Sequence, residues 1–129
     1  NSEFVERAIR AAEAIYALQD ERSGALPGQC AEGWRPLGKW TSLTGNAQMA
    51  IVGYRLARVT GDEEWRQRAK SSLDFCRRLQ DVGHKDQRRS GGLRGSYPGH
   101  IGYGCYLYMN WTQKFYLDAL MCEAGIDVV

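Results

Sequence analysis

Apolar residues recur at three- and four-residue steps in two separate stretches of the chain. In the first, from about Ser2 to Gln19, they are Val5, Ala8, Ile9, Ala12, Ile15 and Tyr16. In the second, which begins at the acidic run Asp62-Glu63-Glu64, they are Trp65, Ala69, Leu73, Cys76 and Leu79. This spacing predicts two amphipathic helices, each with one buried face. Because acidic residues suit a helix start, Asp62 is expected to cap the second of them.

Two other stretches are more uniformly apolar. The first spans about Asn46 to Val59, and the second runs from near Asn110 to about Glu123, with Gly125 placed to end it. A helix that is apolar on all sides is usually a buried one. The sequence therefore predicts two inner helices, the first of them capped by Asn46.

The connections between these four helices alternate in length. About 25 residues join the first two, about three join the next two, and roughly 30 precede the last, whereas loops in compact domains commonly have about 4–6 residues. Each long loop leaves an amphipathic helix and enters an apolar one, so both loops should emerge at the same end. The predicted fold class is all-α: antiparallel helical hairpins, about four main helices, and two long loops rich in glycine and aromatic residues.

The two halves of the chain also resemble each other in sequence. Arg7-Ala8 and Leu18-Gln19-Asp20 match Arg68-Ala69 and Leu79-Gln80-Asp81, and SGALPG at 23–28 resembles SGGLRG at 90–95. A repeated helical hairpin is typical of arrays of paired helices. We expect one domain over residues 1–129, with one hairpin at about 2–60 and a second at about 62–124.

Charge and composition narrow the range of partners. The net charge is +2, from 17 basic and 15 acidic residues spread along the chain, which argues against nucleic acid or an anionic membrane as a partner. No stretch approaches the roughly 20 apolar residues of a membrane span, and the first residues lack the pattern of a signal peptide. We expect a cytoplasmic protein with reduced cysteines and no cofactor. A disulfide between the loop residues Cys30 and Cys105 is the alternative.

Three stretches together resemble the α/α-toroid proteins: LQDERSGALPG, TSLTGNAQMAIVGYRLARVTGDEEW and GGLRGSYPGHIGYGCYLYMNWTQKFYLDAL. That group includes terpenoid-cyclase-like and prenyltransferase-like proteins and the six-hairpin carbohydrate enzymes. The resemblance implies that the amphipathic helices are outer and the apolar helices inner, in a ring of which this chain would form one part. Because a partial ring leaves apolar surface uncovered, we expect a homo-oligomer, specifically a dimer, or a place in a longer chain.

The segment from Gly91 to Trp111 is the richest in side chains suited to a ligand. Tyrosine has a flat apolar face and a polar tip, which suit a sugar ring or an isoprenoid chain, and Arg94 favours a carboxylate or phosphate. The candidate ligand-binding residues are Trp40, Arg94, Tyr97, His100, Tyr103, Tyr108, Asn110 and Trp111. The alternative is that the aromatic residues pack the loop over the helices.

Catalytic and metal-binding signals are sparse. His100 is the candidate proton carrier, because imidazole titrates near neutral pH, with a hydrogen-bonding role as the alternative. Cys30, His84, His100 and Cys105 lack close ligand spacing, so no metal site is predicted. The motifs GxSxG, GxxxxGK[ST] and HExxH are missing, as are the aspartate-rich DxDD and DDxxD motifs of the terpenoid proteins.

Three functions are compatible with this sequence. The first is binding or processing of a carbohydrate, including an acidic polysaccharide, through the long loops. The second is a non-catalytic helical module that oligomerises, and the third is an isoprenoid-binding segment. A cleft lined by aromatic residues would favour the first, loops collapsed onto the helices the second, and a deep apolar tunnel the third.

Overall fold

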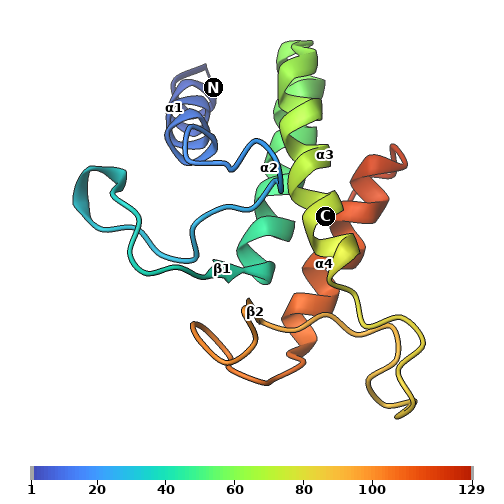
Figure 1. Ribbon diagram of the computed structural model, residues 1–129. Helices are drawn as coiled ribbons and strands as arrows, with labels where there is room; N and C mark the ends of the chain where they lie inside the picture. Colours follow the sequence, from blue (N-terminus) through green and yellow to red (C-terminus); the bar gives the residue numbers. More distant parts are fainter. Residues whose placement is uncertain (1, 129) are drawn as a thin grey trace.

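The computed structural model describes residues 2–128 and is mostly helical, as the sequence predicts (Figure 1). Its elements are, in order, α1 (Ser2–Tyr16), a short 3-10 turn (Glu32–Trp34), β1 (Thr41–Ser42), α2 (Leu43–Thr60), α3 (Glu63–Arg78), β2 (Ser96–Tyr97) and α4 (Asn110–Glu123). Within the described residues, no helix has the length and hydropathy that a membrane crossing requires.

Local capping chemistry explains where most helices begin and end. The carboxylate of Asp62 accepts a hydrogen bond from the Glu64 N–H at 2.9 Å and caps α3, as predicted. The turn between α2 and α3 is short because Gly61 takes a left-handed conformation, with φ of 73°, and its N–H bonds to the Ala57 carbonyl. α4 has the predicted bounds, and Gly125 follows it with φ of 77°.

Two predicted helix boundaries are wrong. α1 ends at Tyr16 rather than Gln19, because the N–H groups of Leu18 and Gln19 bond only three residues back, to the Ile15 and Tyr16 carbonyls, and not four. The side-chain amide of Gln19 instead reaches the Gly24 and Arg68 carbonyls and the Ser72 hydroxyl. α2 begins at Leu43, and its cap is Ser42, whose hydroxyl accepts from the Gly45 N–H at 3.0 Å. Asn46 is therefore not a cap. It is fully buried inside the helix.

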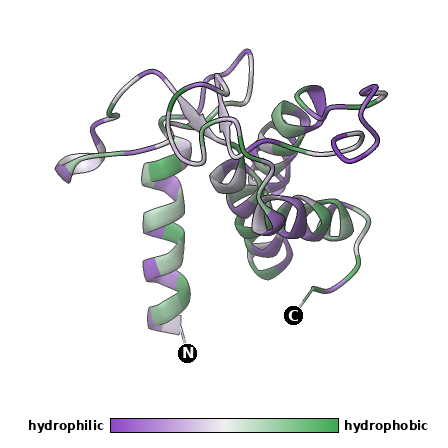
Figure 2. Cartoon of the chain, turned by 90° about the horizontal axis from the view of Figure 1, so that it is seen from below, coloured by the Kyte–Doolittle hydropathy of each residue, from purple (hydrophilic) through white to green (hydrophobic). Residues whose placement is uncertain are grey.

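α2 is the centre of the structure and packs against α3 and α4. Their shared core contains Leu43, Ala47, Ala50, Ile51, Tyr54, Ala69, Leu73, Cys76, Tyr116 and Ala119. α1 contacts this group through a smaller cluster of Ala12, Tyr16, Leu26, Leu56, Ala57 and Trp65. In both views α1 stands to one side of the other three helices (Figures 1 and 2).

The two long loops meet each other beside the start of α2. β1 and β2 pair antiparallel, with Thr41 opposite Tyr97 and Ser42 opposite Ser96. The Leu43 N–H also donates to the Gly95 carbonyl at 3.0 Å. These bonds join segments that lie more than 50 residues apart in the printed sequence, and they place both loops against one another.

Each long loop is anchored by a side-chain amide from the helix that follows it. In the first loop, the Leu26 N–H donates to the Asn46 amide oxygen at 3.1 Å. In the second, the Leu93 N–H donates to the Gln113 amide oxygen at 2.9 Å. Leu26 and Leu93 are both buried, so each bond satisfies a backbone donor that has no access to bulk water.

Further hydrogen bonds correspond between the loops. Gln19 donates to the Gly24 carbonyl in the first loop, and Gln80 donates to the Gly91 carbonyl in the second. The backbone pairs Asp20 to Ala25, and Asp81 to Gly92, are each bonded at 2.9 Å, and Gly28 to Trp40 corresponds to Gly95 to Leu107. The SGALPG and SGGLRG stretches therefore hold equivalent backbone positions.

Candidate functional site

Trp40 lies where the two long loops pack together. A Cβ atom built at Gly28 would lie 2.3 Å from the Trp40 ring, and one built at Gly102 would lie 2.2 Å from it. Only glycine leaves room for an indole at this distance. One edge of the half-buried ring is therefore fixed between the loops, and the rest borders the pockets on either side.

Two adjoining pockets, of about 480 and 340 Å³, lie between the end of α3 and the paired strands. They share the lining residues Arg78, Leu79 and Tyr97, and we call the two pockets together the loop groove. Its principal side chains are Lys39, Trp40, Phe75, Arg78, Asp81, Arg94 and Tyr97. A third pocket, on the other side of Trp40, is lined by Gln29, Ser42 and Tyr103.

Aromatic surface is accessible within the loop groove. The side chain of Tyr97 is 48% exposed, and its ring stands nearly perpendicular to that of Phe75, at 5.9 Å between centroids. Phe75 is buried beneath it on α3 and holds the tyrosine in place. The exposed part of the Tyr97 ring, with the edge of Trp40, gives the groove an apolar wall of the kind that stacks on a sugar.

The charged side chains of the groove are predominantly basic. Arg78 donates a hydrogen bond to the Ser23 carbonyl, and its guanidinium lies 6.0 Å from the Phe75 ring centre. Lys39, next to Trp40 in the sequence, lines the groove from the first loop. Asp81 is the single carboxylate among the lining residues, against the three cations Lys39, Arg78 and Arg94.

Arg94 and Asp81 are joined through Tyr108. The guanidinium of Arg94 lies 5.5 Å from the centre of the Tyr108 ring and donates to its hydroxyl at 3.3 Å. The same hydroxyl donates to Asp81. The hydrogen bond with Tyr108 raises the pKa of Arg94, so the arginine stays charged. Tyr108 therefore fixes one cation and the only carboxylate at the end of the groove.

The predicted site residues do not all fall in one place. Trp40, Arg94 and Tyr97 line the loop groove, and Tyr108 supports it from behind. Tyr103 lies in the pocket beyond Trp40, 6.5 Å from the Trp111 ring, between centroids.

The remaining candidates lie at the surface outside these pockets. Asn110 is exposed at the start of α4, and its side-chain oxygen accepts from the Trp111 N–H at 2.8 Å. Trp111 is 44% exposed. His100 is exposed in the second loop and is not among the side chains that line the groove. The candidate proton carrier is thus separate from the aromatic and basic side chains.

Sequence reasoning missed Phe75, Arg78 and Lys39 as groove residues. Phe75 and Arg78 lie in the last turn of α3, where the helical pattern indicates only a core position and a solvated charge. They reach the groove because β1 pairs with β2 across the end of this helix. The sequence feature that could have identified Arg78 is its position, as a basic residue in the last turn of a helix that leads into a long, aromatic-rich loop.

The cysteines and histidines form no metal-binding site in the described part of the chain. Among residues 2–128, no three His, Cys, Asp or Glu side chains come together as a set of metal ligands, so Cys30, His84, His100 and Cys105 are not assembled. All four cysteines carry free thiols, and Cys30 and Cys105 are not joined by a disulfide.

Comparison of the chain with models of protein families, with curated proteins and with solved structures finds no match. The function is therefore inferred from the geometry of the chain itself.

Proposed function

We propose that the loop groove binds a saccharide that carries acidic groups. The observation that supports this most directly is the combination of an accessible Tyr97 ring and a Trp40 edge with three cations and one carboxylate. Aromatic rings stack on the apolar faces of sugars, and arginine pairs with carboxylates through two parallel hydrogen bonds. A uronic-acid oligosaccharide offers both features along its length.

The individual contacts follow from the positions of the side chains. Arg78 and Arg94 line the groove together with Tyr97 and would each bind a uronate carboxylate, while a sugar ring stacks on the tyrosine. Asp81 accepts the Tyr108 hydroxyl on one oxygen, and its second oxygen would accept a sugar hydroxyl. Lys39 extends the positive surface toward the first loop.

The proposed role is binding rather than hydrolysis. Most glycosidases use two carboxyl groups that lie about 5–9.5 Å apart across the scissile bond. The side chains that line the loop groove include one carboxylate, Asp81, and His100 lies outside it. The groove is also open and basic, so it resembles a sugar-binding surface more than the deep apolar tunnel that an isoprenoid chain requires.

The architecture supports a partial α/α toroid as the setting of this groove. α2 packs on α3 and on α4, and the contact between the two apolar helices α2 and α4 is the one that successive inner helices would make. The corresponding amide anchors of Asn46 and Gln113 give the two hairpins the same connection. Exposed apolar side chains at Tyr103, Leu107 and Trp111 favour association, so a dimer is expected at micromolar concentration. A monomer in sedimentation velocity would contradict that expectation.

Calorimetric titration tests the function. The ligand is a uronic-acid oligosaccharide, and a neutral oligosaccharide of the same length and an isoprenoid diphosphate are the comparison ligands. Arg78→Gln should weaken uronate binding roughly 10- to 100-fold, the value of about 1.5–3 kcal/mol for a hydrogen bond to a charged group. Tyr97→Ala should weaken it about 3- to 10-fold, from the loss of stacking worth about 0.5–1.5 kcal/mol.

Matched control variants lie in the same loop. Arg88→Gln removes an arginine whose side chain is 90% exposed, and Tyr106→Ala removes a 66% exposed tyrosine; neither residue lines the groove. Both should bind the uronate as the unmodified protein does. Equal binding of the neutral oligosaccharide, or unchanged affinity in Arg78→Gln and Tyr97→Ala together, would reject the proposal. Tighter binding of the isoprenoid diphosphate would favour the isoprenoid class instead.

A further inference from the structure

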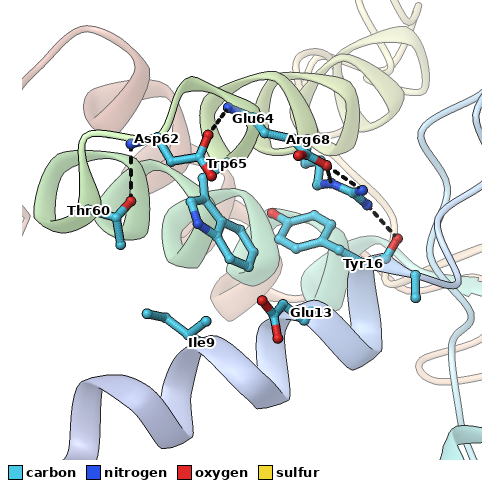
Figure 3. A pocket seen from close by; sticks show the side chains of 9 residues that line it. Ile9, Glu13, Tyr16, Thr60, Asp62, Glu64, Trp65 and Arg68 are labelled. Carbon is cyan, nitrogen blue, oxygen red and sulfur yellow. Dashed lines mark hydrogen bonds and ion pairs between the residues drawn. The ribbon is translucent and has the colours of Figure 1, made fainter. Parts of the chain in front are cut away.

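A separate pocket of about 420 Å³ lies between α1 and the start of α3, at the other end of α3 from the loop groove (Figure 3). α1 supplies one wall and α3, with the end of α2, supplies the other. Its lining residues are Ile9, Glu13, Tyr16, Ala17, Thr60, Asp62, Glu64, Trp65 and Arg68. We refer to it as the α1–α3 pocket.

The back of this pocket holds a polar donor without a partner. Trp65 is only 8% exposed, and its ring packs against Tyr16 at 6.0 Å between centroids. Among residues 2–128, no side chain or carbonyl accepts a hydrogen bond from the indole N–H of Trp65, whereas the Tyr16 hydroxyl donates to the Met49 carbonyl at 2.6 Å. No fully enclosed side-chain nitrogen or oxygen within residues 2–128 lacks a partner, so the indole N–H keeps some access to solvent, and the Trp65 ring that carries it lines the pocket.

The charged side chains around the pocket are mainly acidic. Glu64 is neutralised by Arg68, whose guanidinium contacts its carboxylate at 2.6 Å and also donates to the Tyr16 carbonyl at 3.0 Å. Asp62 caps α3 with one of its oxygens. Glu13 forms no ion pair within the described part of the chain, and Figure 3 shows it on α1, facing the rings of Tyr16 and Trp65.

We propose that the α1–α3 pocket binds a small organic amine that also carries hydroxyl groups. The ammonium group pairs with the carboxylate of Glu13, because Glu13 alone among the three pocket carboxylates forms neither an ion pair nor a hydrogen bond within residues 2–128. A ligand hydroxyl accepts the Trp65 N–H, which gives this nearly buried donor the acceptor that it lacks. The spare carboxylate oxygens of Asp62 and Glu64 accept the remaining ligand protons. A metal ion does not suit the pocket, because no three ligand side chains converge within residues 2–128.

Two probes that differ by a single group test this assignment. 2-Amino-1,3-propanediol is a protonated amine with two hydroxyls, and glycerol has the same shape with a hydroxyl in place of the ammonium. The readout is the indole N–H signal of Trp65 in a nitrogen–proton NMR spectrum at low ionic strength, assigned by its loss in Trp65→Phe. The amine should shift this signal in a saturable manner, and glycerol should leave it unchanged at the same concentration.

Glu13→Gln provides the decisive variant, because Glu13 is exposed on α1 and its replacement keeps both size and helix propensity. It should weaken amine binding about 10-fold or more, as expected for the loss of a charged hydrogen bond. Glu6→Gln, an exposed change on the same helix outside the pocket, should bind the amine normally. Equal shifts with glycerol, or unchanged amine affinity in Glu13→Gln, would overturn the proposal.

Discussion

Asn46 should be the most sensitive polar position in the structure, because one buried side chain holds the first long loop to two helices. Its amide oxygen accepts from the Leu26 N–H at 3.1 Å, and its amide nitrogen donates to the Gly24 carbonyl at 3.1 Å and the Ser72 carbonyl at 3.3 Å. The side chain is fully buried. Asn46→Ala removes all three bonds and introduces no replacement.

The expected cost can be worked out bond by bond. The Leu26 N–H is left without an acceptor in a buried position, which costs about 1–3 kcal/mol. The Gly24 carbonyl keeps its bond from Gln19, and Ser72 lies within α3, so each of these losses costs only about 0.5–1.5 kcal/mol. The total is about 2–6 kcal/mol, a large part of the 5–15 kcal/mol by which domains are usually stable.

Urea denaturation followed by circular dichroism measures this cost. With a slope of about 2 kcal/mol per molar urea, the midpoint of Asn46→Ala should fall by roughly 1–3 M. Gln48→Ala, an exposed change on the same helix, should alter the stability by no more than about 0.5 kcal/mol. Asn46→Asp should be at least as destabilising as Asn46→Ala, because it places an unpaired charge at a fully buried position, facing the Gly24 and Ser72 carbonyl oxygens. A midpoint for Asn46→Ala equal to that of Gln48→Ala would refute the reasoning.

Two further predictions concern titratable groups. Burial raises the pKa of the Cys76 thiol to about 12, whereas Cys105 is exposed. A thiol reagent at neutral pH should therefore modify Cys105 in the native protein and Cys76 only after unfolding. Fast modification of Cys76 in the native protein, detected by peptide mapping, would contradict this. Burial works against the charge of Asp74, but the hydrogen bonds and charges of Lys70 and Arg77 outweigh it and lower the pKa of this carboxyl. Because the folded pKa lies below the unfolded value of about 3.9, the stabilisation is present above that pH and is lost as the pH falls through the folded pKa. Asp74→Asn should therefore flatten the fall in stability on acidification, and an acid transition as steep as that of the unmodified protein would argue against this role.

The parts of the fold that depend on local chemistry could be predicted from the sequence. Asp62 and Gly125 mark their helix ends through capping and positive φ, which involve only neighbouring residues. Asn46 looked like a cap by the same local rule, but its amide bonds to a loop 20 residues earlier and to α3. Its role depends on tertiary structure, so no reading of the neighbouring residues could assign it.

The residues of the candidate site could likewise be predicted from the sequence only in part. Trp40 and Tyr97 could be selected from the sequence, because aromatic residues in long glycine-rich loops are accessible to a ligand. That they lie in one groove depends on the pairing of β1 with β2, which joins distant segments. Arg78 enters the groove for the same reason, since nothing in the helical pattern of α3 distinguishes it from other solvated charges.

Chemical-shift mapping with a uronic-acid oligosaccharide tests the central claim most directly. In nitrogen–proton NMR spectra of the labelled protein, the proposed groove predicts shifts at the Trp40 indole N–H and at the backbone amides of Arg78, Asp81, Arg94 and Tyr97. The Trp65 indole, in the α1–α3 pocket, should stay in place and serve as an internal reference. Saturable shifts that leave the Trp40 indole and the Tyr97 amide unchanged, or no shifts at all at millimolar ligand, would contradict the assignment of this groove as the saccharide site.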